Sequence, residues 1–182
     1  MENLYTGTGD SGYTGLLSLG RVKKTDPIVE AIGSVDELNS VIGIAKSSLH
    51  NKQDISDMLR EVQNKLFIIG AELAMVRNDK TQPKSRIDRK DVKELEEHIH
   101  EIGKRLPELK KFVLPGGTTT GACLHLARSV SRRAERSVVA IQEKYMLNEY
   151  MLAYLNRLSS LMFALALYAN QLEGVKEENP TY

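Results

Sequence analysis

The chain has 182 residues, of which 41% are hydrophobic and 27% are charged. This composition suits one domain with a sizeable core. Lysine and arginine number 25 against 24 for aspartate and glutamate, so the chain lacks the overall positive charge that non-specific binding to nucleic acid needs. Its single cysteine, Cys123, excludes an intrachain disulfide and a zinc site built on several thiolates.

The N-terminal residues lack the apolar stretch of a signal peptide and the Arg/Ser-rich amphipathic character of a transit sequence. No segment is expected to reach the ~20 apolar residues of a membrane span. These features predict a soluble, cytoplasmic protein that contacts neither a membrane nor nucleic acid.

Residues 1–33 contain six glycines and show no sustained periodicity, which predicts an ordered loop or a mobile arm. In the five segments that follow, apolar residues recur every three or four positions, as in amphipathic helices. The first helix is expected to begin at Ser34, because Glu37 completes a capping-box pattern three residues later. The other helices are expected from about Ile55 to Val76, from Asp88 to Pro107, from one of Thr118 to Thr120 to about Tyr145, and from Asn148 to about Leu172.

No segment shows a convincing alternation of apolar and polar residues, so the expected fold is all-α, a five-helix bundle around one core. A single domain is expected over residues 1–182, with an arm at 1–33, the bundle at 34–173 and a polar tail at 174–182. The polar break at 78–86 and the connection before the fourth helix are long for simple helix connections, which makes them candidates for function.

Gly7 to Gly12 formally matches the G-x-G-x-x-G pattern of dinucleotide-binding sites. That pattern needs a strand before it and a helix after it, whereas here only six residues precede it and Tyr13 to Gly15 follow. A loop rich in glycine and threonine can still surround phosphates with N–H groups and hydroxyls. A flexible terminus explains the composition equally well.

Arg128, Arg132 and Glu135 fall within about 60° of one another on the fourth expected helix. Guanidinium groups bind phosphate in a bidentate manner, and a nearby carboxylate can hold them in place. Such a pattern arises more often from ordinary ion pairs on an exposed helix. An anion site is favoured by the local density of arginine, since Arg133 and Arg136 lie close by.

Three further features are less specific. Phe112 precedes a Pro-Gly-Gly turn that leads into a helix, and a place in the core would explain it as well. Asp36, in the first turn of a helix, by itself only complements the helix dipole. His98 and His100 lie about 200° apart around a helix and cannot chelate one metal together, so no metal ligands are predicted.

Six stretches of the sequence indicate a particular protein family when taken together, although each one alone is a modest signal. They are Tyr5 to Asp10 with Gly12 and Thr14, Asp26-Pro27 leading to Gly33 to Asn39, Phe112 to Thr118, His125 to Arg128, Arg132 to Arg136, and Tyr154 to Ser159. In this order, over nearly the whole chain, they resemble the ATP:cob(I)alamin adenosyltransferase family of the trimeric helical-bundle type.

The resemblance implies a homotrimer with an active site at each subunit interface. The implied reaction transfers the 5′-deoxyadenosyl group of ATP to the cobalt(I) of cobalamin and releases triphosphate. Arg128, Arg132 and Glu135 would be catalytic, with Asp36 paired to Arg128, and Phe112 would lie against the lower face of the corrin ring. The residues implied to bind the nucleotide are Thr6, Gly7, Thr8, Gly9, Asp10, Gly12, Thr14, Arg21, Lys24 and Asn156.

The same resemblance implies Mg²⁺ as a cofactor that helps the arginines to neutralise the leaving triphosphate. It also implies a flavin reductase and a B12-dependent acceptor enzyme as partners. The sequence departs from the family at Gly7 and Ser11, where lysine is common. Arg21, Lys23 or Lys24 are expected to supply the missing charge.

Two other functions are compatible with the pattern. One is a non-catalytic corrinoid-binding or delivery protein on the same bundle. The other is a helical interaction module, which is disfavoured because such a module needs neither a glycine-rich arm nor a cluster of arginines.

Overall fold

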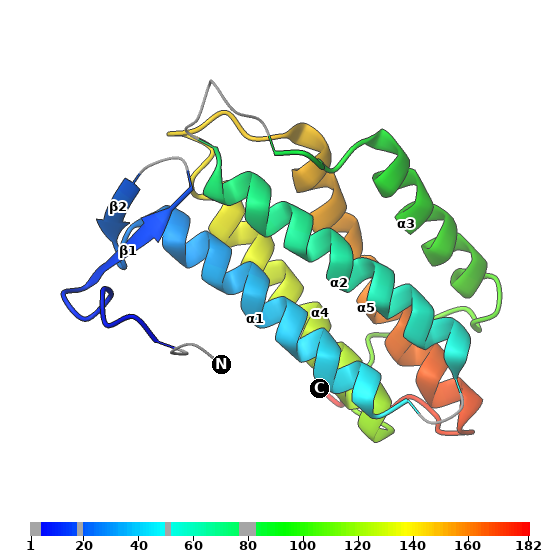
Figure 1. Cartoon of the computed structure of the whole chain (residues 1–182). Coiled ribbons are helices and arrows are strands. Elements are labelled where there is room, and N and C mark those ends of the chain that lie inside the picture. The colour runs from blue at the N-terminus through cyan, green and yellow to red at the C-terminus, as the bar shows by residue number, and fades with distance from the viewer. Residues whose placement is uncertain (1–4, 18–19, 50–51, 77–82) are drawn as a thin grey trace.

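The computed structural model describes residues 5–17, 20–49, 52–76 and 83–182. The helices in this part of the chain are α1 (Pro27–Ser47), α2 (Gln53–Ala74), α3 (Arg89–Gly103), α4 (Thr119–Val139) and α5 (Glu149–Leu172) (Figure 1). Helix α4 packs against both α1 and α5, while α2 lies against α1 and α3 lies against α5. The predicted five-helix bundle is therefore confirmed.

Helix α5 supplies much of the core, because its side chains are buried on most sides. Leu155, Leu158 and Leu165 are completely buried. Among the described residues, α5 is also the one helix long and apolar enough to cross a membrane by length and composition. In its most apolar stretch 61% of the residues are buried by the rest of the chain, as expected of a core helix.

Helix α1 begins at Pro27, so the prediction of a start at Ser34 was wrong. The Oδ1 atom of Asp26 accepts a hydrogen bond from the backbone N–H of Ile28 at 3.0 Å, and a proline in the first turn is preorganised for a helix. Ser34 is buried inside the helix, where its hydroxyl donates to Oγ of Ser137 in α4 at 3.2 Å. The arm therefore ends at residue 26, before the expected boundary at 33.

The predicted starts of the last three helices are confirmed. The side chains of Asp88, Thr118 and Asn148 accept backbone N–H groups at the starts of α3, α4 and α5. Helices α3 and α4 end earlier than predicted, because residues 104–106 and 140–145 continue as turns and bends. Residues 77–82 of the expected polar break lie outside the described part of the chain.

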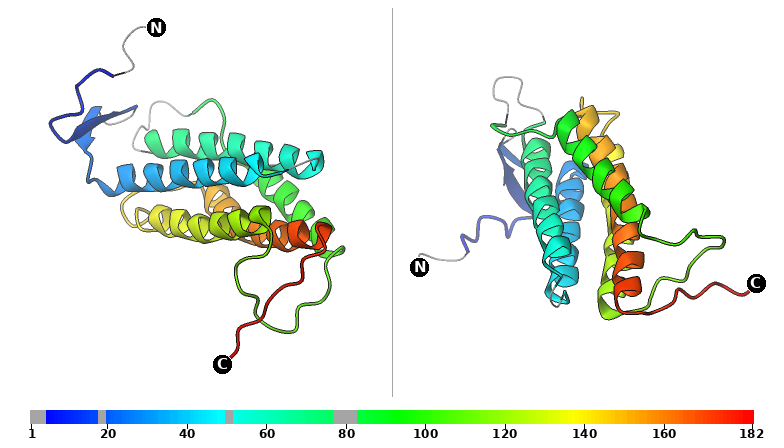
Figure 2. Two further views of the ribbon diagram at one scale, coloured as in Figure 1. Left: turned by 90° about the horizontal axis from the view of Figure 1, so that it is seen from below. Right: turned by 90° about the vertical axis from the view of Figure 1, so that its right-hand side faces the viewer.

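The arm contains a short antiparallel hairpin, β1 (Tyr13–Leu16) paired with β2 (Gly20–Lys23), with Tyr13 opposite Lys23. The prediction that the chain has no strand was wrong here, because four-residue strands are too short to show a clear alternation. The hairpin lies beside the start of α1, and the residues before it extend away from the bundle (Figures 1 and 2).

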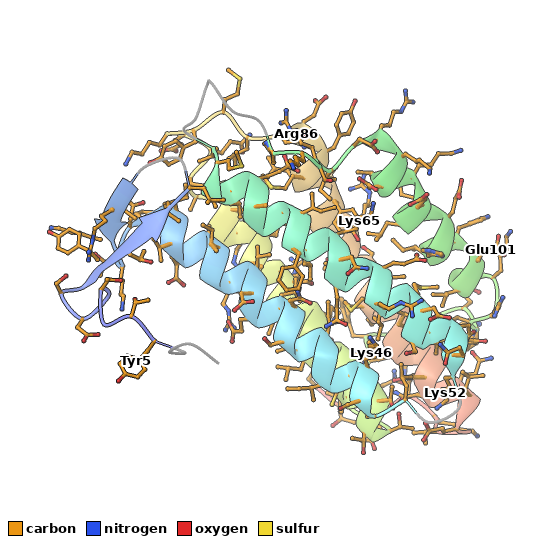
Figure 3. All side chains as sticks on the ribbon, in the orientation of Figure 1. Tyr5, Lys46, Lys52, Lys65, Arg86 and Glu101 are labelled. Carbon is orange, nitrogen blue, oxygen red and sulfur yellow. The ribbon has the colours of Figure 1, made fainter. Side chains whose placement is uncertain are left out.

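Buried Glu72 of α2 joins the segment before α3 to the start of α5. Its carboxylate accepts hydrogen bonds from the backbone N–H of Ile87 at 2.7 Å and from Nδ2 of Asn148 at 2.9 Å. Arg86, at the same end of the bundle (Figure 3), donates through Nε at 3.3 Å. Because three donors satisfy the carboxylate, its burial is tolerated and the first turn of α5 is held in place.

A buried amide of α5 fixes the turn before α4. Oδ1 of Asn170 accepts hydrogen bonds from the backbone N–H and from the hydroxyl of Thr118, both at 2.9 Å, and Nδ2 donates to the carbonyl of Gly116 at 3.1 Å. A Cβ atom at Gly117 would lie 2.3 Å from the Asn170 side chain, and one at Gly121 would lie 2.0 Å from it. These two glycines therefore make the room that Asn170 occupies.

Substitution of Gly121 by alanine is expected to destabilise the fold by about 1–3 kcal/mol, because the buried, hydrogen-bonded Asn170 cannot move away from the new methyl group. Gly70→Ala is the matched control in α2, since a Cβ there has no atom within 4 Å. The control should gain about 0.5–1 kcal/mol from helix propensity. Urea unfolding at one protein concentration measures both, and a Gly121→Ala variant as stable as wild type would refute the role of the close contact.

Candidate active site

Arg128, Arg132 and Glu135, the arginine face, lie along one side of α4 next to α5. Oε1 of Glu135 accepts a hydrogen bond from Nδ2 of Asn156 in α5 at 2.8 Å. Oδ1 of Asn156 in turn accepts from the guanidinium of Arg157 at 2.7 Å, so both ends of the amide are oriented. The fold thus brings together two residues, Glu135 and Asn156, that are far apart in the sequence.

The guanidinium of Arg132 is exposed and forms neither an ion pair nor a hydrogen bond with any other described residue. Arg128 is partly buried, and its Nε atom has no hydrogen-bond partner within the same part of the chain. Arg133, by contrast, forms an ion pair with Glu37 of α1. Arg128 and Arg132 therefore keep donors available for an anionic ligand.

A groove of about 790 Å³ runs beside the arginine face. Phe112 lines it together with Arg128 and Arg132, and its side chain is 79% exposed. A place for Phe112 in the core is therefore ruled out. The remaining lining residues are Leu109, Lys110, Lys111, Val113, His125, Ser159, Ser160 and Phe163. An exposed aromatic ring and several cations in one groove suit a ligand with a flat apolar part and an anionic part.

His125 is a groove residue that the sequence reasoning did not single out as a site residue. It is only 2% exposed, and neither ring nitrogen has a hydrogen-bond partner among the described residues. Its ring lies 6.0 Å from that of Phe163, centroid to centroid. Burial, followed by the charge of Arg128, lowers the pKa of His125, so the ring is neutral near pH 7. The sequence could have indicated His125, because residues three apart on a helix are neighbours and His125 comes three residues before Arg128.

Helical spacing could also have revealed the part of the groove formed by α5. Ser159 lies three residues after Asn156, and Phe163 lies four residues after Ser159, so they share one side of the helix. Lys110 and Lys111 belong to an irregular segment without periodicity, and no sequence signal identified them.

Asp36 does not pair with Arg128 within the described part of the chain. Its side chain is exposed on α1, and its neighbour Glu37 makes the ion pair to α4 instead. The expected pairing of Asp36 with Arg128 is thus not formed inside a single subunit.

The glycine-rich arm forms two successive turns. The backbone N–H of Asp10 donates to the carbonyl of Gly7, and that of Gly12 donates to Gly9, both at 3.2 Å. Gly7 and Gly12 have φ angles of 68° and 79°, a conformation that favours glycine. Strand β1 follows directly at Tyr13, so the segment lacks the helix that a dinucleotide-binding fingerprint requires.

Two cations meet these turns. The guanidinium of Arg21 in β2 donates to the carbonyl of Thr8 and, at 3.3 Å, to the hydroxyl of Ser11. The ammonium of Lys24 would lie 3.1 Å from a Cβ placed on Gly9, so the absence of a side chain at Gly9 makes room for it. Positive charge thus gathers at the turns although Gly7 and Ser11 are not lysine.

The arm also carries several hydroxyl groups. The hydroxyls of Thr6 and Thr8 are 2.9 Å apart, and the partly buried Thr14 belongs to β1. Tyr5, at the start of the described arm, projects away from the bundle (Figure 3). The predicted nucleotide-binding residues of the arm therefore cluster around one small loop.

The sequence matches the family model described as cobalamin adenosyltransferase over residues 4–169. A corrinoid adenosyltransferase from Bacillus subtilis is 42% identical over 175 residues, which cover 94% of this chain and 89% of that protein. A second, from Citrobacter freundii, is 39% identical over 166 residues and covers 91% of this chain and 94% of its own.

The chain belongs to the cobalamin adenosyltransferase family. Its fold agrees with a solved structure of a variant PduO-type ATP:corrinoid adenosyltransferase from Lactobacillus reuteri complexed with cobalamin and ATP. The two have a TM-score of 0.92 and 38% identity, and the match covers 99% of this chain and 100% of the other. A further variant of the Lactobacillus reuteri enzyme, complexed with ATP, gives a TM-score of 0.92 at 37% identity and covers 98% of this chain and 100% of the other.

In this member of the cobalamin adenosyltransferase family, the arm and the groove are separate. No described arm residue lines the groove. The arm lies at the end of the bundle where α1 begins, whereas the segment carrying Phe112 leaves the opposite end (Figure 2). A single chain therefore presents two groups of predicted site residues that it does not join.

Substitution of His125 by glutamine is expected to reduce the acid sensitivity of the fold. Folding lowers the pKa of His125 from 6.5. Below about that pH, the imidazole is therefore protonated in the unfolded chain while it is still neutral in the folded chain, and protonation favours the unfolded state. The free energy of unfolding should therefore decline on acidification, and less so in the variant.

Urea midpoints at about pH 7.5 and about pH 5.5, on either side of the ordinary histidine pKa, measure this difference. His100→Gln, at an exposed position, controls for the loss of a histidine. If the wild type and the His125→Gln variant lose equal stability on acidification, the fold does not hold His125 neutral.

Proposed function

We propose that this protein transfers the 5′-deoxyadenosyl group of ATP to the cobalt(I) of a reduced corrinoid, forming adenosylcobalamin and triphosphate. The observation that carries the proposal is one groove that combines exposed Phe112 with the guanidinium of Arg132, which has no partner among the described residues, on a chain of the cobalamin adenosyltransferase family. Its relatives are named corrinoid adenosyltransferases, and one solved relative is complexed with both cobalamin and ATP.

In this reaction the protein has to position ATP and the corrinoid and to stabilise the negative charge of the leaving triphosphate. Cobalt(I) supplies the electron pair that forms the cobalt–carbon bond at C5′ of ATP, and the C5′–O bond breaks with its electrons leaving on triphosphate. No protein nucleophile or general base is needed. Arg132 and Arg128 have free donors with which to neutralise the leaving group. The hydrogen bond between Glu135 and Asn156 holds the Asn156 amide beside them.

Mg²⁺ is part of the proposal as an ion that arrives with the nucleotide. The described residues include no cluster of three or more His, Cys, Asp or Glu side chains able to hold a metal. Mg²⁺ with a nucleotide is bound mainly by phosphate oxygens and water, and Glu135 is the carboxylate of the arginine face that would hold it. The ion supplies further neutralisation of charge on triphosphate.

Phe112 is proposed to lie against the lower face of the corrin ring. Its exposed side chain would keep the lower axial ligand away from cobalt(II), and loss of that ligand makes reduction to cobalt(I) easier, because axial ligands tune a metal's potential. The neutral ring of His125 and the side chain of Phe163 extend this uncharged part of the groove.

We propose a homotrimer with each active site between two subunits. The arm lies at the end of the bundle where α1 begins, the Phe112 segment lies at the opposite end, and no described arm residue lines the groove, so an arm would have to reach the groove of a neighbour. Exposed Asp36 would likewise pair with Arg128 of another subunit. Exposed Ile44, Phe67 and Leu126 provide apolar surface of the kind that an interface covers.

The proposed location is the cytoplasm, where a lone cysteine such as Cys123 stays reduced. A flavin reductase is proposed as the source of the electron, because cobalt(I) must be generated before transfer. A B12-dependent enzyme is proposed as the acceptor of the product.

Purified protein given ATP, Mg²⁺ and chemically reduced cobalamin should release triphosphate and form adenosylcobalamin in equal amounts. Arg132→Ala should lower the turnover about 10²–10³-fold, as does loss of one preorganised donor to a developing charge, while helical circular dichroism is unchanged. Arg60→Ala, at an exposed arginine of α2 that pairs with Asp57, is the control. Corrinoid binding without triphosphate would instead identify a delivery protein, and normal turnover in Arg132→Ala would remove Arg132 from the mechanism.

Arg21→Ala and Lys24→Ala should each raise the KM for ATP about tenfold, as expected when a charge-assisted hydrogen bond to phosphate is lost, and leave the KM for cobalamin unchanged. Lys23→Ala is the control, because Lys23 is exposed in β2 and has no side-chain contact with the glycine-rich turns among the described residues. If all three substitutions raise the KM for ATP equally, the nucleotide is bound by the general positive charge of the arm and not by the specific positions of Arg21 and Lys24.

A further inference from the structure

The residues after α5, the tail (174–182), fold back onto the segment that carries Phe112. The chain reverses at Gly174, which has a φ of 70°, and the backbone N–H of Val175 donates to the carbonyl of Asn170 at 2.9 Å. Further along, the carbonyl of Glu178 accepts a hydrogen bond from the backbone N–H of Leu114 at 2.8 Å. The tail is thus bound to the protein in a defined course.

Two side chains strengthen this contact. Nδ2 of Asn179 donates to the carbonyl of Phe112 itself at 2.8 Å. Oε1 of Glu177 accepts a hydrogen bond from Nδ2 of Asn170 at 3.0 Å, and the same amide donates to Gly116. Completely buried Asn170 therefore links the tail to the turn that follows the Phe112 segment.

The Phe112 segment, residues 107–115, has little else to hold it. It contains no helix or strand, and among the described residues its sole backbone–backbone hydrogen bond is the one from Leu114 to Glu178. Because the phenyl ring of Phe112 is largely exposed, packing of the ring cannot fix its position. The backbone contacts with the tail must do so.

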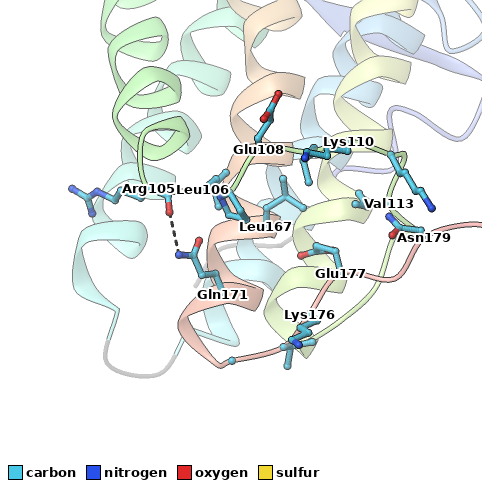
Figure 4. Close-up of a pocket in the computed structure, with 15 residues that line it drawn as sticks. Arg105, Leu106, Glu108, Lys110, Val113, Leu167, Gln171, Lys176, Glu177 and Asn179 are labelled. Carbon is cyan, nitrogen blue, oxygen red and sulfur yellow. Dashed lines mark hydrogen bonds between the residues drawn. The ribbon is translucent and has the colours of Figure 1, made fainter.

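A second cavity, of about 830 Å³, lies between the tail and the Phe112 segment. Val113 on one side faces Glu177 and Asn179 of the tail, with Leu167 of α5 also in the lining (Figure 4). Residues of the stretch 109–113 line both this cavity and the groove. The stretch is therefore a thin wall with space on each side, and its position depends on the tail.

We infer that the tail is a positioning element of the corrinoid site, in which Asn179 holds the backbone of Phe112 and Glu177 anchors the tail to Asn170. The inference rests on the proposed adenosyltransferase function and adds determinants of corrinoid binding that lie outside the groove. A ring that keeps an axial ligand away from cobalt(II) must stay close to the metal, and displacements near 1 Å are enough to reduce catalysis strongly.

The test compares point variants at Asn179 with wild type. Asn179→Ala and Asn179→Asp both remove the donor to Phe112, whereas the longer amide of Asn179→Gln retains it. The first two should raise the KM for cobalamin about three- to tenfold, as expected for loss of one net hydrogen bond. They should also lower the yield of four-coordinate cobalt(II)alamin seen spectroscopically with ATP, and leave the KM for ATP unchanged. Asn179→Gln should keep the KM for cobalamin and the yield of four-coordinate cobalt(II)alamin close to those of wild type.

A variant lacking residues 177–182 loses both hydrogen bonds between the tail and the Phe112 segment. It should show a rise of more than tenfold in the KM for cobalamin and a larger loss of four-coordinate cobalt(II)alamin than the point variants. Tyr182→Ala is the control, because Tyr182 is completely exposed. Unchanged cobalamin KM and cobalt(II) spectra in the truncated protein would overturn the inference, and so would an equal rise in the KM values for ATP and cobalamin.

These outcomes are distinct from failure of the proposed function. Wild-type protein that makes no adenosylcobalamin refutes the transferase activity and the inference together. Wild-type protein that is active, beside an equally active truncated variant, refutes the role of the tail alone.

Discussion

The packing of α4 against α5 is the contact on which the candidate site depends. Helix α4 supplies Arg128 and Arg132, helix α5 supplies Asn156, and the hydrogen bond from Asn156 to Glu135 crosses between them. On the inner side of α4, Ala127 and Ala134 are completely buried. The arginine face thus lies on one core helix and is hydrogen-bonded to a second, which keeps its charges in place without a covering loop.

The other two parts of the site are attached more weakly. The Phe112 segment is irregular and forms hydrogen bonds to the tail, while Asn170 holds the turn that follows it. The arm consists of glycine-rich turns, which two cations, Arg21 and Lys24, contact, and a hairpin of two four-residue strands. In the proposed function, rigid helices would present the charges for triphosphate, while less regular segments, which open and adjust at lower cost, would meet the corrin ring and the nucleotide. Because the net charge of the chain is close to zero, an anionic ligand can be attracted only by such local groups of positive charge.

Some site residues were accessible to sequence reasoning and others were not. Arg128, Arg132 and Glu135 share a helix face by spacing alone, although spacing could not separate an anion site from a solvated surface. Asn156 entered only through the family resemblance, because nothing local distinguishes it. Lys110 and Lys111 were missed, since an irregular segment has no period from which the direction of a side chain can be inferred.

The sequence by itself determined the five helices and most of their starts, because apolar periodicity and caps such as Asp88, Thr118 and Asn148 act within a few residues. It misplaced the start of α1, because the capping-box pattern at Ser34 is local and cannot show that Ser34 is buried against Ser137. Only the tertiary structure decided that Phe112 is exposed and that the tail holds its backbone. Those facts depend on contacts between residues 67 positions apart, which no local pattern encodes.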